Sequence, residues 1–286
     1  MLVDFHVHST ASDGTVAPGE LAKTACAHGY AAMALTDHDN CDGVPEFLFA
    51  SAEGNTRRVA GIELSIDPGE GFDKFHLLGL GVNAQDEGLK NFLRRVLAGR
   101  NERNRRILEN FRRIGIEIGD DDIAKYAHGE VLARPHFARW LVVHGFASDV
   151  KTAFEKYLLA DSPKETHCYE ERWHPAQEEA FAVVHGAGGL CVMAHPKYWR
   201  NSWKHTGCDF AAAKRELATL KEKGLDGLEA LYEANQPVED VEFSRIACEL
   251  GLLKSAGSDF HGSNKPTISL GMEVSERFIV PLLERL

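Results

Sequence analysis

Short apolar runs alternate with amphipathic segments along most of the chain. Seven of these runs have the length and composition of buried strands: residues 2–8, 31–38, 58–65, 75–82, 189–196, 224–232 and 251–259. Helical spacing of apolar residues between them predicts helices over 18–29, 214–224 and 238–251. Alternating strands and helices indicate a parallel sheet, either open or closed into a barrel.

The segment from about 84 to 188 breaks this alternation and predicts helices only. The expected helices span 89–115, 120–127, 133–145, 148–159 and 176–188. We therefore expect a barrel built from 1–84 and 189–286, with 85–188 as a mainly helical insertion that covers the active-site face. The last of these helices could equally belong to the barrel.

Histidines and acids stand where the predicted strands end, in five of the seven runs. His6 and His8 close the first run, and i and i+2 side chains of a strand point to the same face. The carboxyl ends of barrel strands converge on one face, where active sites are built. His76 is an exception, because it lies near the start of its run and needs a bulge or another register to join the others.

Together these positions form a set of candidate metal ligands: His6, His8, Asp13, His38, Glu63, His76, His195, Asp259 and His261. Imidazole and carboxylate together suit Mn, Fe, Co or Zn. The set is too large for one ion, and a carboxylate can bridge two ions about 3.5–4 Å apart in hydrolytic sites. We expect two or three divalent ions, and Mn is the first candidate for their identity.

The composition of the chain limits which kinds of molecule it is expected to bind. A net charge of −11 argues against binding nucleic-acid duplexes through bulk charge. The six cysteines are scattered with no C-x-x-C pair, which is typical of reduced thiols in a cytoplasmic protein. No leader or membrane-spanning segment is visible, so we expect a soluble protein without a membrane partner.

The motifs that carry these residues resemble those of the PHP (polymerase and histidinol phosphatase) family. They are H-x-H (6–8), S-D-G (12–14), T-D-H (36–38), G-I-E (61–63), A-H-P (194–196) and S-D-F-H (258–261). The resemblance implies a distorted (β/α)7 TIM-like barrel and a two- or three-metal site that cleaves phosphoesters.

The resemblance also implies how the ligands are shared among three metal positions. His6, His8, Glu63 and Asp259 hold the first, Glu63, His76 and His195 the second, and Asp13, His38 and His261 the third. Asp37 is expected to hold these ligands in position without binding the metal itself. A metal-bridging hydroxide would attack phosphorus, and the proton donor to the leaving group is not assigned.

Residues 133–164 are similar to a subgroup of nucleoside 3′,5′-bisphosphate phosphatases and 5′–3′ exoribonucleases. The similarity implies that Arg134, His136 and Lys164 bind substrate phosphate. Two departures put the substrate in doubt: SPKETHCY (162–169) replaces a G-K-P-x-Y motif, and AHPKYW (194–199) replaces A-H-P-G-R-Y. Asn235 also stands where a histidine is typical.

Other notable residues have ordinary interpretations. The arginine-rich stretch 94–113 is expected to be a solvated helix face with i,i+4 ion pairs, and one wall of a phosphate channel is the alternative. Trp173 and Trp199 are the better candidates for base stacking, with Trp140 in the core and Trp203 a further candidate. His28, His128, His144, His185 and His205 are expected to bind no metal, and His167 and His174 stay undecided.

The function expected from these features is metal-dependent hydrolysis of a phosphate monoester on a nucleotide, such as a nucleoside 3′,5′-bisphosphate or a short RNA 5′ end. Histidinol-phosphate phosphatase is the alternative within the same chemistry. An amidohydrolase or deaminase, and a PHP module without catalysis, are the alternatives outside it.

Overall fold

The computed structural model describes residues 1–69, 73–126, 131–200 and 207–286. One eight-stranded sheet curves into a nearly closed barrel, with strand order β7-β6-β5-β4-β3-β2-β1-β8. Its strands are β1 Leu2–Val7, β2 Ala32–Leu35, β3 Arg57–Ile66, β4 Phe75–Leu80, β5 Leu190–Met193, β6 Gly227–Tyr232, β7 Leu253–Gly257 and β8 Met272–Glu273. All seven expected strands are present, so the prediction of a distorted seven-stranded α/β barrel is confirmed, with β8 as a short addition.

The barrel closes where β1 and β7 meet. The Asp259 amide donates to the His6 carbonyl at 2.8 Å, and the His8 amide donates to the Phe260 carbonyl at 2.9 Å. Gly257 is required here, since a Cβ at this position would lie 2.4 Å from the His6 Cβ. The segment after β7 therefore meets the end of β1 at the histidines that begin the sequence motifs.

The sheet is not wholly parallel, which corrects the expectation from the strand–helix alternation. β4 runs antiparallel to both β3 and β5. The connection between β3 and β4 is too short to hold a crossover helix, and only an antiparallel neighbour can be reached in that way. The start of β4 consequently lies at the same edge of the sheet as the carboxyl ends of the other strands.

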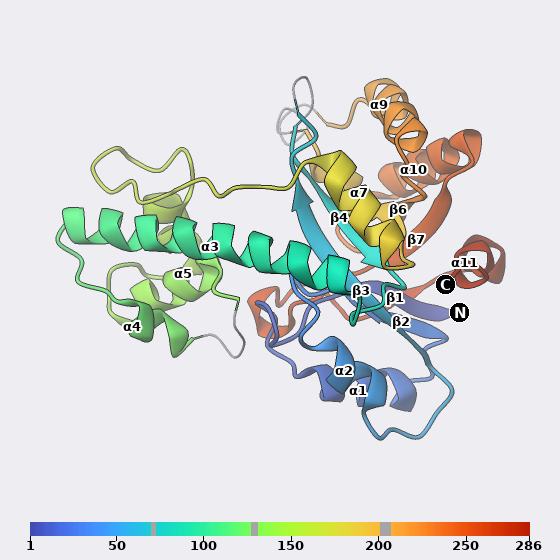
Figure 1. Cartoon of the computed structure of the whole chain (residues 1–286), viewed down its shortest axis with the longest axis horizontal. Coiled ribbons are helices and arrows are strands. Elements are labelled where there is room, and N and C mark those ends of the chain that lie inside the picture. Colours follow the sequence, from blue (N-terminus) through green and yellow to red (C-terminus); the bar gives the residue numbers. More distant parts are fainter. Residues whose placement is uncertain (70–72, 127–130, 201–206) are drawn as a thin grey trace.

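Helices surround this barrel on its outer side (Figure 1). They are α1 Pro18–Ala27, α2 Val44–Phe49, α7 Gln177–Gly186, α9 Phe210–Glu222, α10 Pro237–Leu250 and α11 Glu276–Leu283. α7 contributes Ala180, Phe181 and Val184 to the barrel core, so the last helix of the expected insertion packs on the barrel.

A helical lobe projects from one side of the barrel along α3 (Figure 1). It contains α3 Glu87–Arg113, α4 Asp120–Ala124, α5 Arg134–Val143, α6 Val150–Ala153 and the π-helical turn η1 Phe154–Leu158. A separate apolar cluster around Phe111, Phe137 and Trp140 holds these helices together. The lobe therefore has its own core, and Trp140 lies in it as expected.

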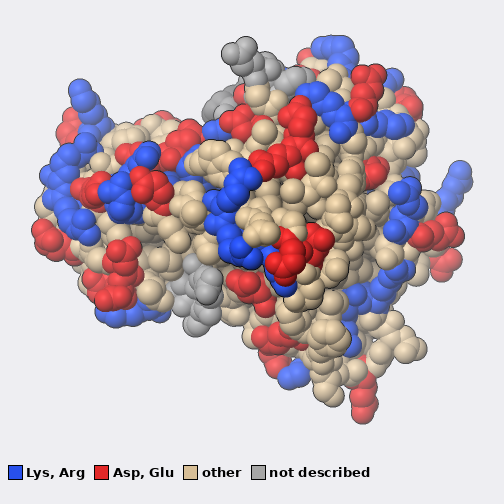
Figure 2. Space-filling view, viewed as in Figure 1, with Lys and Arg blue, Asp and Glu red and all other residues tan. Residues whose placement is uncertain are grey.

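The arginines of α3 fall into two classes. Arg105 and Arg106 pair with Glu102 on the surface, and Figure 2 shows basic and acidic side chains interspersed over this face. Arg100 and Arg103 are each only 5% exposed and point inward. The solvated-face prediction is wrong for these two, because they lie on the inner stripe of an amphipathic helix.

Within the described part of the chain, no helix is both long and apolar enough to cross a membrane.

Candidate metal centre

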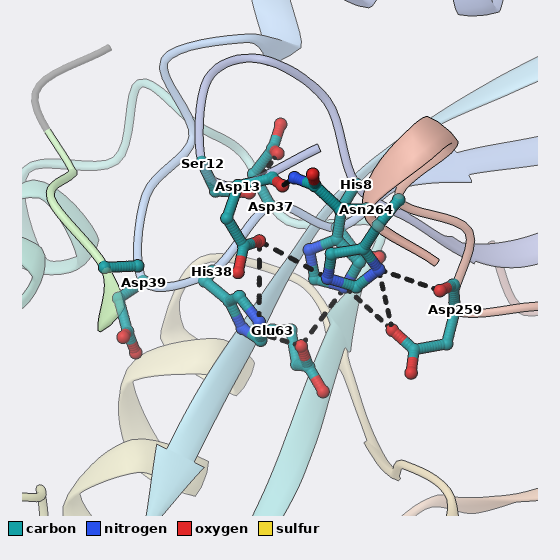
Figure 3. Close-up of polar contacts among 12 residues, drawn as sticks. His8, Ser12, Asp13, Asp37, His38, Asp39, Glu63, Asp259 and Asn264 are labelled. Carbon is teal, nitrogen blue, oxygen red and sulfur yellow. Dashed lines mark hydrogen bonds and ion pairs between the residues drawn. The ribbon is translucent and has the colours of Figure 1, made fainter. Parts of the chain in front are cut away.

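All nine candidate ligands lie in one cluster at the mouth of the barrel. Five of them, His8, Asp13, His38, Glu63 and Asp259, point toward one another from β3 and from the segments after β1, β2 and β7 (Figure 3). The cluster contains three groups of residues, and within each group all the candidate ligand atoms lie within 4.8 Å of one another. The groups are His8, Asp13, His38 and His261; His6, Glu63 and His195; and His6, His8 and Asp259.

His76 reaches the cluster because β4 is antiparallel. Its Nδ1 lies 2.8 Å from Oε1 of Glu63, and the His195 Nε2 lies 3.1 Å from the same oxygen. The other oxygen of Glu63 lies 2.8 Å from Nδ1 of His38. Glu63 therefore faces histidines from β4, from the loop after β5 and from the loop after β2.

The donor atoms lack the partners that buried polar groups need. Among the described residues, Asp13 Oδ1, His38 Nδ1 and Glu63 Oε2 are buried and make no well-aligned hydrogen bond, although His38 Nδ1 and Glu63 Oε2 lie only 2.8 Å apart. Nε2 of His6 and Nε2 of His8 also face each other, at a distance of 3.1 Å. A shared cation satisfies all of these atoms at once, and the residues present therefore fit divalent metal ions.

Carboxylates in the cluster are held in the ionised form. Burial raises the pKa of Glu63, but the imidazoles of His76, His38 and His6 bring it well below its ordinary value. Burial also lowers the pKa of His38, to about 4, which leaves its imidazole neutral. Ionised carboxylates and neutral imidazoles are the forms that bind metal, so His38 is ready to bind, whereas His8, with a pKa of about 9, must first lose a proton.

Residues behind the ligands fix their orientation. Glu229, on β6, is fully buried; its Oε1 lies 3.0 Å from Nδ1 of His6, and its Oε2 accepts the His195 amide at 2.5 Å. A carboxylate on the far nitrogen of a ligating histidine sets its tautomer and raises its basicity. Sequence reasoning missed Glu229, although an acid inside an otherwise apolar strand was a visible signal.

Asp37, which is expected to support the ligands, binds a loop and not the imidazole ring of a candidate ligand. Its Oδ1 accepts from the Ser9 amide at 2.7 Å and from the Ser12 hydroxyl at 2.6 Å, and its Oδ2 accepts from the Ser9 hydroxyl at 2.6 Å. Ser9 and Ser12 belong to the loop that carries Asp13. Asp37 thus positions that ligand through the main chain.

Two of the candidate ligands have left-handed backbone conformations, which non-glycine residues rarely adopt. His195 has a φ of 27° and Asp259 a φ of 60°. Such conformations cost about 1–3 kcal/mol each and persist where the surroundings impose them. Here the carboxylate of Glu229 binds the His195 amide and the His6 carbonyl binds the Asp259 amide.

Beside the cluster lies a cavity of about 290 Å³ with cationic walls, here called the arginine pocket. Asp13, His38 and His76, which are candidate metal ligands, form its border with the cluster. Its cationic residues are Lys74, Arg100, Arg103, Arg134 and Arg172. Burial and the neighbouring Arg100, Arg134 and Arg172 bring the pKa of Arg103 well below its ordinary value, so the pocket is strongly suited to an anion.

One buried acid partly balances these cations. Oδ2 of Asp39 accepts from Nε of Arg100 at 2.8 Å and from Nη1 of Arg172 at 2.5 Å. Asp39 points away from the cluster (Figure 3) and directly follows His38. It therefore ties the end of β2 to the helical lobe and to the segment that carries Arg172.

The structure separates the three expected phosphate-binding residues. Arg134 lines the arginine pocket. His136 is buried, and its Nδ1 accepts the Ala133 amide at 3.0 Å at the start of α5. Lys164 is exposed and lines a different cavity with Arg113 and His167. Lys164 therefore lines neither the arginine pocket nor the metal cluster.

The structure also places the tryptophans that are candidates for base stacking and several of the remaining histidines. Trp199 is only 3% exposed and donates to the Asp73 carbonyl, so the interpretation of Trp199 as a stacking residue is wrong. Trp173 is 43% exposed beside Arg95. His174 lines the arginine pocket, and His185 pairs with Asp226 at 2.7 Å. Trp203, His128 and His205 lie outside the described residues.

Comparisons with known proteins agree on one family. The model of the PHP domain matches residues 4–182. A 3′,5′-nucleoside bisphosphate phosphatase from Chromobacterium violaceum is 32% identical over 91% of this chain and 87% of its own. A 5′-3′ exoribonuclease from Haemophilus influenzae is 30% identical over 96% of this chain and 98% of its own.

Solved structures show the same similarity. A protein from Chromobacterium violaceum, described as an amidohydrolase with bound sulfate and no metal, has a TM-score of 0.83 and 29% identity, covering 99% of this chain and 96% of that one. A protein from Bifidobacterium adolescentis, named as a metal-dependent phosphoesterase, has a TM-score of 0.81 and 28% identity with the same coverage. The relatives found by sequence and the solved structures are thus both matched over most of their length. The chain belongs to the PHP family and is a phosphoesterase of that family.

Proposed function

We propose that the chain hydrolyses the 3′-phosphate ester of a nucleotide that also carries a 5′-phosphate. The observation that carries this proposal is the shared border of two anion-binding regions. His38 and His76 belong both to the metal cluster and to the wall of the arginine pocket. A substrate with two phosphates on one ribose can place one in each region.

The nine candidate ligands would hold divalent ions, which would lower the pKa of coordinated water and neutralise charge on the reacting phosphoryl group. The expected positions for these ions are the three sets given by the family resemblance, with Glu63 shared by two of them. Mn is the first candidate, since imidazole and carboxylate ligands accept several divalent metals. The number of ions and their identity are part of the proposal.

The arginine pocket would then hold the phosphate that does not react. Arg103 is 5% exposed, and its Nη2 is buried without a hydrogen-bond partner among the described residues. Guanidinium binds phosphate through paired N–H groups. Arg134 provides a second guanidinium on the same wall, and Lys164 is left out of this role because it lies on another cavity.

The relatives that share most of this chain support a nucleotide substrate. Their names describe action on nucleoside bisphosphates and on RNA. Histidinol phosphate carries a single phosphate and leaves the arginine pocket without an anion, so we rank it below a bisphosphate. The expected cytoplasmic location stays a prediction.

The test compares substrates with one and two phosphates on manganese-loaded protein. We expect phosphate release from adenosine 3′,5′-bisphosphate to exceed that from 3′-AMP, 5′-AMP and histidinol phosphate. Arg103→Met should lower kcat/KM for the bisphosphate about 10- to 100-fold, as expected for a lost charge-assisted hydrogen bond, with much less effect on 3′-AMP. Arg105→Met, on the exposed face of α3, is the matched control.

Two results would contradict the proposal. One is an equal loss for both substrates in Arg103→Met, which would remove the arginine pocket from substrate recognition. The other is faster hydrolysis of histidinol phosphate than of any nucleotide.

A further inference from the structure

A second cavity borders the metal cluster and is larger than the arginine pocket. Its volume is about 940 Å³, within the range of about 300–1,000 Å³ that is common for small-molecule sites. Five of its lining residues are candidate metal ligands: His38, Glu63, His76, His195 and Asp259. Among the lining residues, the two cavities share only His38 and His76. A molecule that occupies both must therefore cross the metal cluster.

The wall of this cavity carries an exposed aromatic ring. Tyr198 is 42% exposed and comes from the segment AHPKYW, where the sequence departs from the subgroup. The ring is supported by its neighbours: Nζ of Lys197 lies 5.4 Å from its centroid, and the ring of Tyr232 meets it edge-on at 5.9 Å. Tyr198 is thus held as a platform on the wall of the cavity.

Lys197 is fixed in turn and does not fill the cavity. Its Nζ donates to the Ala234 carbonyl at 2.6 Å and pairs with Glu239 at 2.8 Å. The replacement of glycine and arginine by Lys197 and Tyr198 therefore moves the positive charge into an internal ion pair. It leaves an aromatic face where the subgroup motif has a guanidinium.

The same cavity contains ammonium groups that suit a polyanion. Lys265 is 40% exposed, and its Nζ lies 2.5 Å from Oδ2 of Asp259, the oxygen that also accepts from the Tyr232 hydroxyl at 3.0 Å. Lys151, from α6 of the helical lobe, also lines the cavity; it is 84% exposed and lies 3.7 Å from the exposed carboxylate of Glu155. An aromatic face beside positive charge is the usual combination in sites for single-stranded nucleic acid.

We propose that this second cavity is a subsite for the second nucleotide of a 5′-phosphorylated single strand, with Tyr198 stacking its base. The inference rests on the proposed function, which places the 5′-phosphate in the arginine pocket and the 3′-phosphoryl group at the metal cluster. A bisphosphate ends at that phosphoryl group. A longer chain continues from it, and the second cavity is the space that receives the continuation.

The reaction is the same for both substrates. The oxygen of a water molecule forms a bond to phosphorus, the bond from phosphorus to the 3′-oxygen of the first nucleotide breaks, and that oxygen gains a proton while the water loses one. A bisphosphate yields a nucleoside 5′-monophosphate and inorganic phosphate. A longer strand yields the same monophosphate and a shortened strand that again begins with a 5′-phosphate and can enter the arginine pocket.

The experiment measures kcat/KM for adenosine 3′,5′-bisphosphate and for a 5′-phosphorylated tetra-adenylate on manganese-loaded protein. The readout is the ratio of the two values, strand over bisphosphate. Tyr198→Ala should lower this ratio about tenfold or more, as removal of a stacking ring does in single-strand binders. Tyr198→Phe keeps the ring and should restore the ratio to within about twofold of the wild type.

Phe49→Ala is the matched control, because Phe49 is an exposed aromatic residue on α2 that lines neither cavity. Wild-type protein that cleaves the bisphosphate but not the strand would overturn the subsite and leave the proposed function standing, and so would an unchanged ratio in Tyr198→Ala. Wild-type protein that cleaves neither substrate would overturn both.

Discussion

His6 and Glu229 lie 3.0 Å apart, measured from Nδ1 to Oε1, with both side chains fully buried in the barrel. His6 thereby presents its Nε2 to the cluster, where it lies 3.3 Å from Oε1 of Glu63. Glu229 also binds the main chain of His195. One carboxylate on β6 thus orients a ligand at the end of β1 and a ligand after β5.

Replacing Glu229 should weaken metal binding without removing a ligand. In Glu229→Gln, we expect the affinity for manganese to fall about 10- to 100-fold, as other losses of a carboxylate behind a ligating histidine do. Calorimetric titration of chelator-treated protein measures this affinity. Wild-type affinity in the variant, with the fold intact, would show that His6 needs no such partner.

Asp39→Asn should destabilise the fold. The buried Arg100 and Arg172 both depend on this carboxylate, and breaking a buried pair from one side costs about 3–5 kcal/mol. Glu109→Gln removes an exposed ion pair with Arg105 and should cost at most about 1 kcal/mol. Urea unfolding of both variants checks the difference, and equal losses would remove the structural role given to Asp39.

Metal affinity should rise with pH. Burial lowers the pKa of His8, but its hydrogen bonds to Asp259 and Glu63 raise that pKa to about 9 in the metal-free site. A metal ion must displace this proton, so protonation opposes binding below pH 9 and stops opposing it above. Manganese titrations between pH 6.5 and 9.5 should give affinities that increase and then level off. An affinity that is constant across this range would contradict a protonated His8.

Arg134 and Lys164 should differ in their effect on catalysis. Arg134→Met should lower kcat/KM for adenosine 3′,5′-bisphosphate at least about 10-fold, because Arg134 lines the arginine pocket. Lys164→Met should change it less than about twofold, since Lys164 lines another cavity. Steady-state kinetics of the two variants decide the matter, and a larger loss in Lys164→Met would restore the role implied by the subgroup similarity.

The sequence predicted the barrel and a set of candidate ligands that the structure places in one cluster, because strand ends and metal-ligand chemistry are both local patterns. It left His76 unplaced, since strand direction depends on the length of a connection and on pairing with distant strands. His76 needed no bulge, because β4 enters the sheet from the opposite end.

The walls of the two cavities were harder to foresee. Arg103 belongs to a stretch that resembles a solvated helix, and only the packing of the lobe shows that it faces inward. Arg172 and Lys74 reach the arginine pocket from loops, which carry no periodicity. Trp199 and Tyr198 are adjacent in the sequence, yet one is buried in the core and the other is exposed.

We propose that ions held by the nine clustered side chains are required for phosphoester hydrolysis. The most direct test adds manganese stepwise to chelator-treated protein while bound metal and phosphate release from adenosine 3′,5′-bisphosphate are measured together, with Glu63→Gln in parallel. We predict that wild-type activity rises with metal content and needs more than one ion per chain, and that Glu63→Gln binds less metal and loses at least about 100-fold in activity. Full activity in the metal-free wild type, or in Glu63→Gln, would contradict the account.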